Sequence, residues 1–202
     1  MILAVGDSFF DKTSACYSNI KLKTWPEHFD DEVKVIGHSG CDNYKIFQTL
    51  MEEFNKDTYD MVCINWTQLH RLTIGKDNFV MGGTERWNDK VFIDCLYERT
   101  HWYQMETMIE RFEALEKAVR YLPCKVIQSI GPYPFGPKTR YKMIGPQRIQ
   151  DRYWNLLEKS QHVYLADLSC KWTDVFVAEN DGHPNNEGHR LIYNWIKRQN
   201  TL

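Results

Sequence analysis

Short apolar runs recur along this chain, and longer stretches with helical periodicity separate them. The first run, Met1 to Val5, contains apolar residues only, and similar runs lie at 33–37 and 60–66. Continuous runs of this kind are typical of strands that are buried on both faces, as in a parallel sheet covered by helices. The alternation therefore predicts an α/β fold with a parallel sheet, right-handed crossovers and helices on both faces.

The same patterns predict the individual elements. Besides the first run, strands are expected at 33–37, 60–66, 124–130 and 162–167, which gives about five. Helices are expected at 44–55, 100–122, 147–159 and from about residue 187, where apolar residues recur every three or four positions. Thr24 and Pro26 predict a short helix, residues 72–98 an excursion over the sheet edge, and residues 180–186 a turn.

Composition narrows the class of protein. The 202 residues, 43% of them hydrophobic, suit a single domain over residues 1–202. A formal net charge of -2 provides no broad basic surface, so no nucleic-acid partner is expected. No window approaches the roughly 20 apolar residues of a membrane helix, so no membrane association is expected either.

The cysteines and histidines show no metal-binding pattern. The six cysteines are scattered without a C-x-x-C pair, and no two histidines have the i, i+4 spacing of a helical metal site. We therefore expect neither a metal nor a cofactor. The start of the chain lacks a basic region and a cleavage site, which favours a cytoplasmic protein with reduced thiols. Release by a non-classical route, with disulfides, is the alternative.

Gly6-Asp7-Ser8 directly follows the first expected strand. Gly6 permits a sharp turn there. Ser8 would then lie at the carboxyl edge of the sheet, where open α/β folds bind their ligands, and it is a candidate nucleophile. Taken alone, the stretch is read equally well as a turn or a helix cap.

Three further polar stretches belong with this one. Ser39-Gly40 and residues 65–68 follow expected strands, and Asp181-Gly182-His183-Pro184 precedes the last helix. In order and spacing the four stretches resemble the SGNH (GDSL-type) hydrolase family, over nearly the whole chain. The resemblance implies a flavodoxin-like, three-layer α/β/α sandwich and a serine esterase.

The roles of the family carry over to the matching positions. Ser8 matches the nucleophile, and His183 matches the base that takes its proton. Asp181 is the best match for the acid that orients His183. Gly40 matches the glycine whose backbone N–H, together with that of Ser8, stabilises the oxyanion, and one such donor is worth roughly 3–4 kcal/mol.

The acid position departs from the family pattern. The family separates its acid and histidine by two residues, whereas Gly182 alone separates Asp181 from His183. Asn180, at the usual acid position, cannot carry a negative charge. Asp181 reaches the imidazole if the turn is tighter, and a Ser–His dyad supported by a backbone carbonyl is the alternative.

The third block of the family is also altered. Where the family has Gly-x-Asn-Asp, this chain has Asn65-Trp66-Thr67-Gln68. Gln68 is preferred as the side-chain amide of the oxyanion hole, with Asn65 as the alternative. His70 and Arg71 follow at the same edge and are candidates for binding an anionic or sugar substrate, although Arg71 is equally consistent with pairing to a carboxylate.

A loop rich in Pro and Gly at residues 131–137 carries aromatic side chains and is followed by basic residues. It makes Tyr133 and Arg140 further substrate-binding candidates. Aromatic faces suit sugar rings, so a small-molecule or glycan ester, above all a carbohydrate O-acetyl ester, is favoured over a long acyl chain. The residues behind this preference are Trp66, Trp87, Tyr133, Phe135 and Arg140.

Two other classes stay open. One is an inactive SGNH-fold protein that acts as a glycan-binding or structural module, which the altered third block motivates. The other is a flavodoxin-like nucleotide or signalling domain. That class needs a glycine-rich phosphate loop after the first strand, and only Gly6 is found there.

Overall fold

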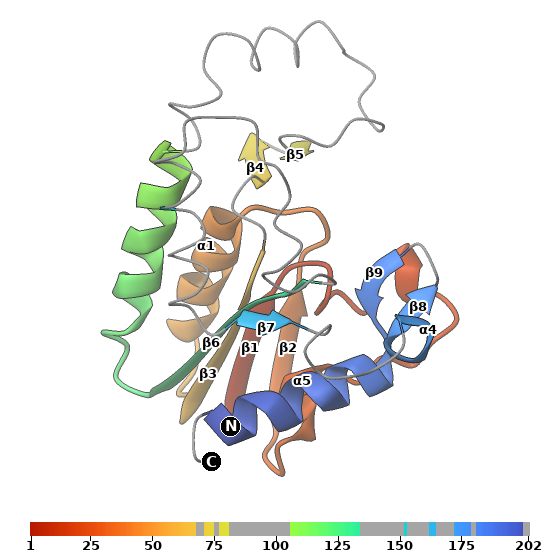
Figure 1. The fold of residues 1–202 in the computed structure, drawn as a ribbon. Coiled ribbons are helices and arrows are strands. Elements are labelled where there is room, and N and C mark those ends of the chain that lie inside the picture. The colour runs from red at the N-terminus through yellow and green to blue at the C-terminus, as the bar shows by residue number, and fades with distance from the viewer. Residues whose placement is uncertain are drawn as a thin grey trace, which may run out of the picture.

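A parallel sheet forms the centre of the protein (Figure 1). The computed structural model describes residues 1–67, 71–74, 77–80, 106–133, 152, 162–164, 172–178 and 181–199. Within them the sheet has five strands in the order β2-β1-β3-β6-β7, and every neighbouring pair is parallel. The strands are Ile2–Gly6 (β1), Val33–Gly37 (β2), Met61–Trp66 (β3), Lys125–Tyr133 (β6) and His162–Tyr164 (β7). The predicted sheet of about five parallel strands is confirmed.

The register of the sheet locates a ligand-binding edge. Gly6, the last residue of β1, pairs with Gly37 of β2 and with Asn65 of β3. The chain leaves β1 for β2 on one side and then crosses to β3 on the other. The carboxyl ends of β1 and β3 therefore flank the point where the strand order reverses, which is where open α/β sheets bind ligands.

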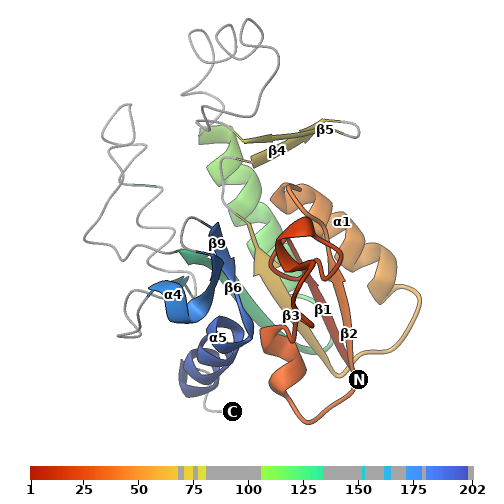
Figure 2. The same ribbon diagram turned by 90° about the vertical axis from the view of Figure 1, so that its right-hand side faces the viewer.

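Helices cover both faces of the sheet, as Figures 1 and 2 show. The helix Asn43–Phe54 (α1) and the helix at 106–119 pack on one face, against apolar side chains such as Leu3, Val5 and Ile64. The helix Asn186–Gln199 (α5) and the 3-10 turn Trp25–His28 (η2) pack on the other face, against Ile2, Ala4 and Cys63. The three-layer α/β/α sandwich is thus confirmed.

Helix starts follow the local sequence signals. The Asp42 carboxylate accepts a hydrogen bond from the Lys45 N–H at 2.8 Å and so caps α1. At the start of η2, the N–H and the hydroxyl of Thr24 both donate to the Glu27 carboxylate at 2.8 Å. Pro26 lies in the first turn of η2, as Thr24 and Pro26 predicted.

The turn predicted at 180–186 was wrong. Asp181–Pro184 (β9) forms a strand that pairs antiparallel with Phe176–Ala178 (β8), outside the main sheet. Gly and Asp are depleted in strands and Pro is confined to strand edges, so this short pairing leaves no periodic signal in the sequence.

Three smaller elements complete the described residues. Ala15–Tyr17 (η1) is a 3-10 turn, Arg71–Ile74 (β4) pairs with Asp77–Val80 (β5), and Trp172–Val175 (α4) is a short helix. The helix predicted at 147–159 lies outside the described residues except for Arg152. Among the described residues, no helix has the length and hydrophobicity that are needed to cross a bilayer.

Candidate active site

Ser8 occupies a tight turn at the end of β1. In this turn the Phe10 N–H donates to the Asp7 carbonyl at 3.0 Å, and the Asp11 N–H donates to the Ser8 carbonyl at 3.3 Å. Ser8 is only 4% exposed, and within the described residues its Oγ makes no hydrogen bond. Burying a hydroxyl without a partner costs about 1–3 kcal/mol.

A buried polar network joins this turn to the neighbouring strands β3 and β6. The Asp7 carboxylate accepts hydrogen bonds from the Phe9 N–H at 3.1 Å and from Asn65 Nδ2 at 3.2 Å. Asn65 Oδ1 in turn accepts from the Ser129 hydroxyl at 2.9 Å. Asn65, the alternative side-chain donor for the oxyanion, therefore lies inside β3 with both ends of its amide hydrogen-bonded in the core.

Gly40 lies in the loop that follows β2, the strand beside β1. Its φ of 75° is in the left-handed region that favours glycine. The flanking amides are engaged, because the Ser39 N–H donates to Asp11 and the Cys41 N–H to the His38 carbonyl. Within the described residues, the N–H groups of Ser8 and Gly40 make no hydrogen bond, so both remain candidates for oxyanion donors.

The C-terminal hairpin places His183 beside the turn that contains Ser8 and Phe9. The imidazole of His183, in β9, lies with its centroid 5.3 Å from the ring of Phe9, the residue that follows Ser8. The ring of Tyr17 in η1 is 5.8 Å away, and both aromatic rings stand nearly perpendicular to the imidazole. Asp181 is the first residue of the same strand, and its backbone pairs with Ala178.

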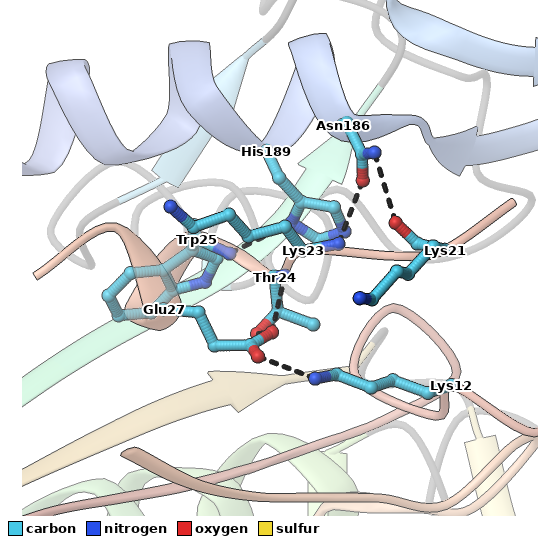
Figure 3. Close-up of polar contacts among 8 residues, drawn as sticks. All are labelled: Lys12, Lys21, Lys23, Thr24, Trp25, Glu27, Asn186 and His189. Carbon is cyan, nitrogen blue, oxygen red and sulfur yellow. Dashed lines mark hydrogen bonds and ion pairs between the residues drawn. The ribbon is translucent and has the colours of Figure 1, made fainter. Parts of the chain in front are cut away.

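Polar contacts anchor the start of α5, which follows His183, to an N-terminal segment (Figure 3). Asn186 accepts a hydrogen bond from the Lys23 N–H at 2.8 Å and donates one to the Lys21 carbonyl at 3.1 Å. His189 Nδ1 accepts from the Trp25 N–H at 3.3 Å. Segments more than 160 residues apart are therefore joined next to the candidate base.

His189 is a structural member of this region. It is fully buried, and burial lowers the pKa of its imidazole to about 3, with a smaller contribution from the nearby His28. A histidine that stays neutral and accepts a backbone hydrogen bond holds the chain in place. Among the described residues, no three His, Cys, Asp or Glu side chains lie close enough together to hold a metal ion.

Solved structures resemble this fold, whereas no protein-family model and no curated protein sequence matches the chain. A catalytic mutant of Axe2, an acetylxylan esterase from Geobacillus stearothermophilus, gives a TM-score of 0.55 at 14% identity, over 98% of this chain and 92% of that chain. A GDSL-like lipase from Bacteroides thetaiotaomicron gives 0.51 at 17% identity, over 100% and 88%. The chain has the SGNH (GDSL) hydrolase fold. At these identities the likeness concerns the fold, so the activity must be argued from the residues of the site.

The structure describes Ser8 after β1, Gly40 in the loop after β2 and His183 in β9, whereas several other predicted site residues are not described. Gln68, His70 and Arg140 lie outside the described residues, as do Trp87 and Phe135. Only the backbones of Arg71, in β4, and Tyr133, at the end of β6, are described.

Trp66 was expected to contact substrate, and that expectation was wrong. Its side chain is fully buried, its Nε1 donates to Gln128 Oε1 at 2.8 Å, and its ring packs 5.6 Å from that of Phe112. As the last residue of β3, Trp66 belongs to the core beneath the helix at 106–119.

Sequence reasoning missed the residues that hold the loops around this candidate site. The Thr67 N–H donates to Asn43 Oδ1 at 2.8 Å, and Asn43 Nδ2 donates to the Thr67 carbonyl at 3.1 Å, which ties the end of β3 to α1. Asp11 similarly joins two loops through Ser39. A motif at fixed spacing gives no signal for such pairs, because each depends on how two separate loops meet.

Proposed function

We propose that the chain is a serine esterase that hydrolyses a carboxylic ester through an acyl-enzyme. One observation carries this proposal: the hydroxyl of Ser8 is buried without a hydrogen bond at the switch point of the sheet, and His183 packs against the adjacent Phe9. A buried, unpaired hydroxyl, next in the chain to a side chain that packs against an imidazole, suits a nucleophile that is activated by a general base.

The reaction follows from these groups. Ser8 Oγ bonds to the ester carbonyl carbon while His183 takes the hydroxyl proton, and the N–H groups of Ser8 and Gly40 donate to the oxyanion. The tetrahedral intermediate collapses, and His183 returns the proton to the alcohol oxygen as the C–O bond breaks. Water then attacks the acyl-enzyme, with His183 again acting as base and then as acid, and Ser8 is restored.

The supporting residues complete the proposal. Asp181, or a backbone carbonyl, orients the imidazole of His183 and stabilises its charged form. Gln68 supplies the third oxyanion donor.

For the substrate we propose a small-molecule or glycan ester, specifically an acetylated carbohydrate. The rings of Phe9 and Tyr17 pack nearly perpendicular to the His183 imidazole, and we propose that these two bulky side chains limit the acyl group to a small one. Axe2, a structural neighbour, is an acetylxylan esterase. The proposed contacts with the alcohol or sugar portion are His70, Arg71, Tyr133 and Arg140.

The test compares the native chain with Ser8→Ala and with Ser18→Ala, a matched change at an exposed serine. The substrates are p-nitrophenyl acetate, butyrate and octanoate, together with acetylated xylo-oligosaccharides. We expect the native chain and Ser18→Ala to hydrolyse the acetyl esters fastest, and Ser8→Ala to lose at least about 10³-fold in kcat. A fluorophosphonate probe should label Ser8 in the two active proteins. Equal rates for the native chain and Ser8→Ala, or labelling at another residue, would contradict the proposal.

A second candidate is a glycan-binding module that keeps the fold without turnover. The observation in its favour is that Asn65, one of the two candidate amide donors of the altered third block, has both ends of its amide hydrogen-bonded in the core. Calorimetric titration of acetylated oligosaccharides into the native chain separates the two. Binding without hydrolysis would replace the esterase by this module.

A further inference from the structure

Asp11 links the two loops that carry the candidate oxyanion donors. It lies three residues after Ser8, and its carboxylate accepts four hydrogen bonds. Oδ1 accepts from the N–H and the hydroxyl of Thr13 at 3.0 and 2.6 Å, within its own loop. Oδ2 accepts from the N–H and the hydroxyl of Ser39 at 3.2 and 2.6 Å, in the loop that carries Gly40. One oxygen therefore serves each loop.

The two loops also touch through their backbones. A Cβ on Gly37 would lie 2.1 Å from the Asp11 nitrogen and 2.2 Å from the Phe10 carbonyl carbon, so the chain after Ser8 runs directly over the end of β2. The His38 N–H donates to the Gly6 carbonyl at 3.1 Å just beneath. The side-chain link through Asp11 extends this contact outward to Ser39.

In the loop that carries Gly40, the hydrogen bonds leave one backbone N–H without a partner among the described residues. The Ser39 N–H is taken by Asp11, and the Cys41 N–H by the His38 carbonyl at 3.5 Å. Between them, the N–H of Gly40 makes no hydrogen bond to the described residues, and Gly40 has a φ of 75°. The bond from Ser39 to Asp11 therefore fixes the peptide plane next to the one that presents the Gly40 N–H.

The charge of Asp11 is maintained in this setting. Partial burial by itself would raise the pKa of the Asp11 carboxyl, but the hydrogen bonds from Ser39 and Thr13 outweigh burial and hold the pKa below its usual value. At the neutral pH where a histidine base works, the carboxylate stays ionised. Its hydrogen bonds are then of the stronger, charge-assisted kind.

We infer that Asp11 is a positioning residue, which holds the Gly40 N–H in place beside the Ser8 N–H as an oxyanion donor. The inference rests on the proposed esterase function. Because a preorganised donor must be held where the charge develops, loosening this link weakens transition-state stabilisation more than substrate binding. The effect therefore falls on kcat rather than on KM.

A matched pair of variants tests the inference. Ser39→Ala and Thr13→Val each remove one hydroxyl that donates at 2.6 Å to the same carboxylate, but only Ser39 belongs to the loop of Gly40. We expect Ser39→Ala to lower kcat on p-nitrophenyl acetate about three- to tenfold, and Thr13→Val to leave it within about twofold. Asp11→Ala should lower kcat about 10- to 100-fold, since loss of a whole donor costs about 10²- to 10³-fold. KM should change less than about threefold in each.

Two further readouts exclude a merely structural effect. The double variant Asp11→Ala/Ser39→Ala should be no slower than Asp11→Ala, because both changes break the same link. Melting temperatures should fall by similar amounts in Ser39→Ala and Thr13→Val, whose kcat values differ. Equal kcat losses in these two variants, or additive losses in the double variant, would overturn the inference while the esterase function stands. A native chain that neither hydrolyses esters nor binds the fluorophosphonate at Ser8 would overturn both.

Discussion

Replacement of His189 by Asn is expected to remove much of the acid sensitivity of this protein. Burial holds the imidazole of His189 neutral in the folded protein, with a pKa of about 3, whereas in the unfolded chain its pKa is the ordinary 6.5. Between pH 6.5 and pH 3 the unfolded chain therefore binds one proton more than the folded protein. The free energy of unfolding must then fall as the pH falls through this range.

The size of the effect follows from the same two values. Where the unfolded chain binds one whole proton more than the folded protein, the free energy of unfolding falls by about 1.4 kcal/mol for each pH unit. Integration from pH 7 to pH 5, with an unfolded pKa of 6.5, gives a loss of about 2 kcal/mol from His189. Burial also lowers the pKa of His28, which acts in the same direction and is unchanged by the replacement.

His189→Asn keeps an acceptor near the position of Nδ1, which accepts from the Trp25 N–H. The smaller side chain leaves a cavity, so at pH 7 the variant should be less stable than the native chain by about 1–3 kcal/mol. Because Asn does not titrate, this gap should narrow by about 2 kcal/mol between pH 7 and pH 5.

Urea unfolding of both proteins at pH 7, 6 and 5, followed by tryptophan fluorescence, measures the gap. His28→Asn serves as the comparison, and its gap should narrow by less because His28 is partly exposed. A gap for His189→Asn that stays constant within about 0.5 kcal/mol would refute the reasoning, since the native imidazole would then have an ordinary pKa.

Three further changes in stability follow from the structure. Gly37→Ala should cost about 3 kcal/mol in urea unfolding because the new Cβ meets backbone atoms of Asp11, whereas Gly182→Ala, with nothing within 4 Å, should stay within about 0.5 kcal/mol; equal losses would contradict the packing argument. Thr67→Val should raise the melting temperature or leave it unchanged, since the buried Oγ1 of Thr67 makes no hydrogen bond to the described residues; a clear drop would show a hidden partner. Asn186→Ala removes two hydrogen bonds to backbone and should cost about 1–2 kcal/mol by the same unfolding assay; no loss would mean that water replaces them.

The sheet and the place of Ser8 were predictable because local pattern carries them. A strand buried on both faces needs a continuous apolar run, and Met1 to Val5 has no other stable location. Once the run is a parallel strand, Gly6-Asp7-Ser8 must fall at its carboxyl end. The structure puts Ser8 there, in a turn beside Gly37 of β2 and Asn65 of β3.

Long-range packing carried no comparable signal. Trp66 is an aromatic residue of the kind that binds sugar rings. Because successive side chains of a strand point to opposite faces, a shift of one position along β3 decides whether the ring faces the core or the site, and it lies in the core. The β8–β9 hairpin consists of residues that disfavour strands. The link between Asp11 and Ser39 spans 28 residues and exists only because two loops meet above β1 and β2.

The candidate base depends on polar contacts more than on the core. Ser8 is held in position by β1 of the buried sheet, whereas His183 lies on a hairpin outside that sheet. Asn185 holds the hairpin to the carbonyls of Asp174 and Phe176, and Asn186 holds the next turn to the N-terminal segment. Because such bonds contribute only about 1 kcal/mol each, a change in them shifts the imidazole without unfolding the sheet. In this fold, activity and stability should therefore separate most readily at the C-terminal hairpin, and least readily at β1.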